Sequence, residues 1–113
     1  MKTLIFLTLL LALPAIQASA KKESRDDYLD RIEYACNVRV KQDQKNHREV
    51  CSCVTRNFDA KLNTQDLELL ARSHEEEKAA EEELQNEKHN DLILFDYEVT
   101  EACLENPKWD HGK

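Results

Sequence analysis

The sequence predicts a small all-α domain, a helical hairpin or bundle of three to four helices stapled by two disulfides. Composition is the first reason. The chain contains one glycine and two prolines, whereas a β-rich fold of this size needs turn glycines and many β-branched residues. Strong helix formers such as Ala, Leu, Glu and Lys dominate instead. The second reason is that apolar residues recur every three or four positions, which is the spacing of one helical face.

Residues 1–20 have the pattern of a signal peptide. Lys2 precedes an apolar run, and Ala18-Ser19-Ala20 forms a small-residue cleavage motif. The run is shorter than the ~20 apolar residues that a membrane-spanning helix needs. We therefore expect cleavage after Ala20, a secreted or periplasmic location, and one mature domain of residues 21–113 that is not inserted in a membrane.

The mature chain is acidic. Once Lys2 is removed, 15 basic residues stand against 23 acidic ones, a formal net charge of −8. The basic clusters that bind phosphate backbones are lacking, so we expect no nucleic-acid partner. We expect a protein partner with a basic surface, because a small domain of this charge attracts cationic molecules.

Two helices are predicted in the first half of the mature chain. The first begins at Ser24, which forms a capping-box pattern with Asp27. Residues 41–45 are polar and predict a connection, and the second helix begins at Asn46. Because the connection is short, the two helices should lie antiparallel. Their apolar stripes are Tyr28, Leu29, Ile32, Ala35, Cys36 and Val40 in the first, and Val50, Val54, Phe58 and Leu62 in the second.

The second half is less regular. A third helix should begin near Asn63 or Thr64 and bury Leu67, Leu70 and Ala71. Residues 72–90 carry two glutamate triplets and few apolar residues, which predicts a solvated acidic helix or a linker. The triplets lack the pattern of a calcium-binding EF-hand loop.

A fourth helix is predicted over residues 91–105. Alternation of Phe95, Tyr97 and Val99 makes a short strand the competing interpretation. The helix is favoured because Asn106-Pro107 supplies a natural stop and because one helical face holds Leu92, Phe95, Val99, Ala102 and Cys103.

Four cysteines compensate for a thin apolar core, since small exported domains are commonly stabilised by disulfides. On a helix Cys51 and Cys53 point about 200° apart, so they should have different partners. Cys36 and Cys51 lie equally far from the connection. This favours Cys36–Cys51 with Cys53–Cys103, while the exchange of Cys51 and Cys53 between the two bridges stays open.

The cysteines have two other conceivable roles. His47, Cys51 and Cys53 fall within seven positions, a spacing compatible with zinc, but cysteines of exported proteins are usually oxidised, so we expect no metal ion and no cofactor. A thiol–disulfide redox protein that uses Cys51 and Cys53 is the alternative function, because Cys51 lies near a helix N-terminus.

Three stretches carry a resemblance to a class of known proteins. Val50-Cys51-Ser52-Cys53-Val54, the segment from Asn63 to Leu70, and Ala102-Cys103-Leu104 together resemble small exported bacterial proteins with a CxC helix and one later cysteine. The resemblance implies a periplasmic helical fold and transfers no active site. A secreted venom or salivary polypeptide is the eukaryotic alternative.

No hydrolase motif is present, since no serine lies in a G-x-S-x-G elbow. The histidines His47, His74, His89 and His111 have polar sequence neighbours and are expected at the surface. The sequence therefore predicts a non-enzymatic protein-binding or envelope accessory protein, such as an inhibitor, immunity factor, chaperone or toxin-like protein. The candidate contact residues are Tyr28, Phe95, Tyr97 and Trp109, although Trp109 is also expected to pack on the helices.

Overall fold

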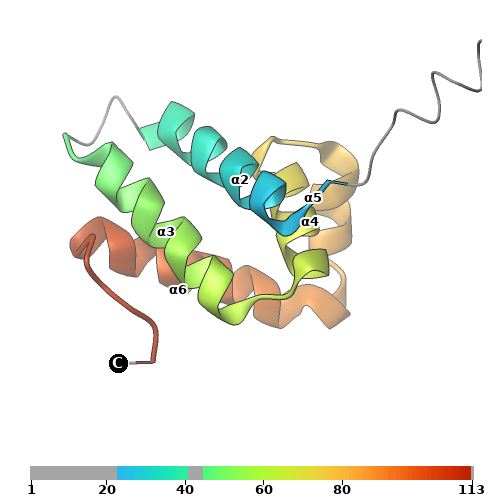
Figure 1. The fold of residues 1–113 in the computed structure, drawn as a ribbon. Helices are drawn as coiled ribbons and strands as arrows, with labels where there is room; N and C mark the ends of the chain where they lie inside the picture. The colour runs from blue at the N-terminus through green and yellow to red at the C-terminus, as the bar shows by residue number, and fades with distance from the viewer. Residues whose placement is uncertain (1–22, 41–44, 113) are drawn as a thin grey trace, which may run out of the picture.

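The computed structural model describes residues 23–40 and 45–112, and every regular element in these ranges is helical (Figure 1). The predicted leader, its cleavage site and residues 41–44 lie outside the described residues. The all-α prediction is confirmed, with five α-helices in place of three to four. The elements are α2 (Arg25–Val40), α3 (His47–Lys61), α4 (Thr64–His74), α5 (Lys78–Leu84), the 3-10 helix η1 (Glu87–His89) and α6 (Asn90–Glu105).

Helices α2 and α3 lie side by side and run antiparallel, as predicted (Figure 1). The capping box of α2 is present, because the Ser24 N–H donates to the Asp27 carboxylate at 2.9 Å and the Asp27 N–H donates to Ser24 Oγ at 3.3 Å. The start of α3 has no side-chain cap. Asn46 precedes the helix but makes no side-chain capping bond, because its backbone (φ −104°, ψ 35°) is not in the extended conformation that a capping side chain requires.

Helix α4 begins as predicted, since the Asn63 side chain accepts a bond from the Asp66 N–H at 2.7 Å. It ends in a Schellman motif around Glu76, whose φ is +65°. The Glu77 N–H reaches back to the Arg72 carbonyl at 3.0 Å, and the Glu76 N–H reaches the Ser73 carbonyl at 2.8 Å. This turn directs the chain into α5.

Residues 72–90 contain the end of α4, all of α5 and η1. Ala80 is fully buried and Leu84 is 6% exposed, and four residues separate them, so both lie on one side of α5. The glutamates Glu81, Glu82 and Glu83 are exposed. A single pair of apolar residues thus anchors a seven-residue helix whose remaining surface is acidic.

Helix α6 is continuous, and within the described residues no strand competes with it. It lies along α3 (Figure 1) and buries Leu92, Val99 and Cys103. None of the described helices is long and apolar enough to cross a membrane. The largest fully buried side chains of the core are Phe58, Ile32, Leu67, Leu70, Val50, Val54 and Val99.

Candidate binding surface

The first-choice disulfide pairing is confirmed. Cys36 is bonded to Cys51 and Cys53 to Cys103, with Cα–Cα distances of 5.7 and 5.8 Å, both typical of disulfides. Because Cys51 and Cys53 project from different sides of α3, one bridge ties α3 to α2 and the other ties α3 to α6. The four cysteines are at most 5% exposed.

This pairing leaves no thiol free. Cys51 and Cys53 are bonded to different partners and both are fully buried, whereas a redox-active pair needs two accessible sulfurs that bond to each other. In the part of the chain that the structure describes, no group of three or more His, Cys, Asp or Glu side chains is placed to hold a metal ion.

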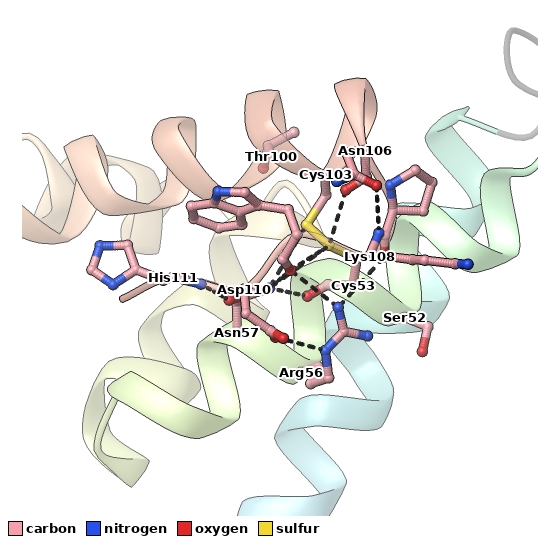
Figure 2. Close-up of a disulfide and its surroundings, with 12 residues drawn as sticks. Ser52, Cys53, Arg56, Asn57, Thr100, Cys103, Asn106, Lys108, Asp110 and His111 are labelled. Carbon is pink, nitrogen blue, oxygen red and sulfur yellow. Dashed lines mark hydrogen bonds and ion pairs between the residues drawn. A yellow bond between two sulfur atoms is a disulfide. The ribbon is translucent and has the colours of Figure 1, made fainter. Parts of the chain in front are cut away.

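The C-terminal segment, residues 106–112, folds back beside the Cys53–Cys103 bridge (Figure 2). Asn57 of α3 is 2% exposed, and both polar atoms of its side-chain amide bond to the C-terminal segment. Its Nδ2 donates to the Trp109 carbonyl at 3.1 Å, and its Oδ1 accepts from the His111 N–H at 2.7 Å. Arg56 adds a bond from its guanidinium to the Trp109 carbonyl at 3.1 Å. The segment therefore shields the second bridge.

The four predicted contact residues do not form one surface. Tyr28 is 7% exposed and belongs to the core, where it precedes Ile32 by one helical turn. Phe95 and Trp109 are half-buried and pack against the core, and His111 contacts both rings edge to face at centroid distances of 5.2 and 5.7 Å. The packing of Trp109 on the helices is thus confirmed. Tyr97 alone is widely exposed, at 66%.

The expectation that all four histidines lie at the surface is wrong for His74. This residue is 8% exposed and joins three helices, with Arg39 of α2 at its Nδ1 and Asp96 of α6 at 3.0 Å from its Nε2. Arg39 can only donate, so Nδ1 must accept and Nε2 carries the proton that it donates to Asp96. The polar neighbours Ser73 and Glu75 concealed the position of His74 one turn after the buried Leu70.

Charge is distributed very unevenly along the chain. Residues 78–105 contain nine of the 23 acidic residues and only two of the 16 basic ones. Their formal charge of −7 equals the net charge of the whole chain. The remainder of the whole sequence is therefore neutral, and the remainder of the predicted mature chain carries a charge of only −1. The net acidity thus belongs to α5, η1 and α6.

Outside this segment, four arginines of the described residues form ion pairs with carboxylates. Arg31 donates to both oxygens of Glu75 at 2.6 and 2.9 Å, and Arg72 donates to Glu77 at 2.9 Å. These bonds lower the pKa of Glu75 and of Glu77 below the ordinary range. Glu75 and Glu77, two carboxylates of the predicted acidic run, thus form ion pairs within the molecule. Further pairs are Arg25–Asp59, Arg31–Glu23 and Arg56–Asp110.

The solvent side of α6 has the opposite character. Leu94 is 56% exposed and Tyr97 66% exposed. Among the described residues, Asp91, Glu101 and Glu105 have no ion-pair partner, and Glu98 contacts only His111 at 3.6 Å. We call this surface the α6 outer face and define it as Asp91, Leu94, Tyr97, Glu98, Glu101 and Glu105, all exposed. It combines apolar contact area with uncompensated negative charge.

No protein-family model matches this chain, and no curated protein or solved structure is significantly similar to it.

Proposed function

We propose that this chain is an exported, non-enzymatic protein that binds the basic surface of a partner protein through the α6 outer face. The observation that carries the proposal is the confinement of the net charge to residues 78–105, next to Leu94 and Tyr97, which are large apolar side chains left in solvent. Charge complementarity favours a cationic partner and speeds its approach.

The two kinds of side chain have different roles in such a contact. Carboxylates attract a basic surface over a distance of about one Debye length, ~8 Å at physiological salt. Burial of Tyr97 and Leu94 then supplies short-range affinity, because aromatic side chains are frequent energetic centres of protein interfaces. The combination gives an interface that forms quickly at low salt and is held by apolar contacts.

Export is supported by the leader pattern of residues 1–20 and by the two disulfides, which are typical of proteins that fold in an oxidising compartment. Inhibitors, immunity factors, chaperones and toxin-like proteins all work by protein contact. The thiol–disulfide alternative gains no support from the geometry, since Cys51 and Cys53 lie in separate buried bridges.

Affinity capture from the native compartment tests the proposal with matched variants. The face variant removes three charges from the α6 outer face (Asp91→Asn, Glu101→Gln, Glu105→Gln). The control variant removes three from exposed carboxylates of α2, α3 and α4 that make no ion pair among the described residues (Asp30→Asn, Glu49→Gln, Glu68→Gln). We expect a basic partner to be retained by the wild type and the control variant and lost by the face variant. Equal retention by both variants would contradict the proposal.

A further inference from the structure

The α6 outer face adjoins a small cleft between α5 and α6. The cleft has a volume of about 200 Å³, below the ~300 to 1,000 Å³ of pockets that enclose drug-sized ligands, so its size suits a single long side chain. Its lining is part apolar and part acidic: Ser73, Glu81, Leu84, Gln85, Ile93, Asp96 and Tyr97.

Two carboxylates, Glu81 from α5 and Asp96 from α6, line the cleft, and no lysine or arginine is among its lining residues. Asp96 is only 19% exposed. Its Oδ2 accepts the proton of His74 Nε2 at 3.0 Å and its Oδ1 accepts from the Thr100 hydroxyl at 3.4 Å. The other ring nitrogen of His74, Nδ1, accepts from Arg39. Asp96 is thus a partly buried carboxylate that forms no ion pair with a lysine or arginine among the described residues.

We infer that this cleft receives a lysine or arginine side chain from a basic segment of the partner protein. The aliphatic stem would lie on Leu84, Ile93 and the Tyr97 ring, and the cation would be placed between Glu81 and Asp96. Long basic side chains bind in this way because they bury apolar stems while their charged ends keep polar partners. Desolvated charge-assisted bonds are also stronger than those at an open surface. The inference rests on the proposed function and identifies the part of the surface that would select a long basic side chain.

The test uses the mature protein and a probe peptide of four Lys-Ala-Ala repeats, acetylated and amidated, at low ionic strength. We expect saturable NMR shifts centred on the amides of Leu84, Ile93 and Tyr97. A second peptide with 2,4-diaminobutyrate in place of lysine has the same charge but a stem shorter by two methylenes. This peptide should bind several-fold more weakly and should leave the cleft amides unshifted.

Two matched pairs of variants locate the contact. Glu81→Gln removes a carboxylate inside the cleft, and Glu101→Gln removes one outside it on the same acidic side. Tyr97→Ala and Leu94→Ala truncate exposed apolar residues inside and outside the cleft respectively. We expect the lysine peptide to bind about tenfold more weakly to Glu81→Gln and at most about twofold more weakly to Glu101→Gln, because a charge-assisted bond in a cleft contributes more than screened surface charge. Tyr97→Ala should likewise weaken binding of the lysine peptide more than Leu94→Ala does.

The possible outcomes distinguish a failure of the cleft inference from a failure of the proposed function. If the peptide binds but the two glutamine variants and the two peptides behave alike, the cleft inference fails while the basic-partner function stands. If free 1,4-diaminobutane shifts the cleft amides as strongly as the peptide does, the site belongs to a small amine and the inference is overturned. If no saturable shift occurs with the peptide, the cleft inference and the basic-partner function both fail.

Discussion

The α2–α4 part of the molecule and the α5–α6 part differ in their balance of acidic and basic residues. In the first, arginines are paired with carboxylates across helices, as in Arg31–Glu75 and Arg25–Asp59. The second part contains nine acidic residues and only two lysines. Three carboxylates of α6 have no ion-pair partner among the described residues. The ion pairs of the first part link helices to one another, whereas the net charge of the second part is not balanced within it.

The acidic residues of the α6 outer face destabilise their own helix. Glu98, Glu101 and Glu105 follow one another at spacings of three and four, so like charges lie next to each other along α6. Such pairs destabilise a helix by about 0.2 to 0.5 kcal/mol each. A basic partner surface would offset this repulsion, as the proposed binding role of α6 requires.

The largest expected effect comes from removing the disulfide that ties α6 to α3. The double substitution Cys53→Ala with Cys103→Ala opens a 50-residue loop and should cost about 4 kcal/mol. The control pair, Cys36→Ala with Cys51→Ala, opens a 15-residue loop inside the paired part and should cost about 3 kcal/mol. Urea unfolding followed by circular dichroism measures both. A smaller loss for the first pair would show that α6 is held mainly by packing.

Asn57 is the second connection, because it fixes the C-terminal segment that follows α6 onto α3. Asn57→Ala should destabilise the fold by about 1 to 3 kcal/mol, since it leaves buried polar groups of the segment without partners. It should also speed reduction of the Cys53–Cys103 bridge by dithiothreitol, followed by mass spectrometry. Arg56→Ala removes an exposed donor to the same segment and should have a smaller effect. Equal reduction rates in all three proteins would mean that the segment does not shield the bridge.

Glu76 lies at the boundary of the two parts and has a positive φ, which costs a non-glycine residue about 1 to 2 kcal/mol. Glu76→Gly removes that strain but adds flexibility to the unfolded chain, so we expect a net gain of about 0.5 to 1 kcal/mol and a rise in the melting temperature of a few degrees. Glu82→Gly, inside α5, should lower stability by about 1 kcal/mol. A loss in both variants would contradict the conformation of the turn.

Much of the fold could be predicted from residue spacing, and the missed features are those that local spacing does not encode. Four-residue apolar intervals fixed α3, and the opposed directions of Cys51 and Cys53 on it indicated the bridges. The turn at Glu76 was missed because neither glycine nor proline marks it; two ion pairs, Arg31–Glu75 and Arg72–Glu77, support it from either side. The α6 outer face was missed because its carboxylates lie among apolar residues in the sequence.

The smallest expected effect is a difference of sign between two glutamates. Glu75→Gln removes a paired charge and should lower stability slightly, while Glu101→Gln relieves repulsion on α6 and should raise it by about 0.2 to 0.5 kcal/mol. The pKa of Glu75 is lowered in the folded state by its bonds to Arg31. Its contribution is therefore complete above the unfolded pKa, near 4.5, and is lost as pH falls through the lowered folded value. Thermal melts from pH 7 to pH 3 should thus show Glu75→Gln melting below the wild type at the upper end of this range, with the difference disappearing toward the lower end.

The most direct test of the central claim measures the surface potential of the two parts without any partner. Nitroxide probes of equal size, one cationic and one anionic, are added in turn to the isotopically labelled protein, and the relaxation of each amide proton is recorded. We expect the relaxation caused by the cationic probe to exceed that caused by the anionic probe several-fold at exposed amides of residues 78–105. The two probes should act almost equally at residues 25–74, where nine acidic and nine basic residues balance. Raised salt should abolish the difference. A cationic-to-anionic ratio that is the same in both parts would contradict the account.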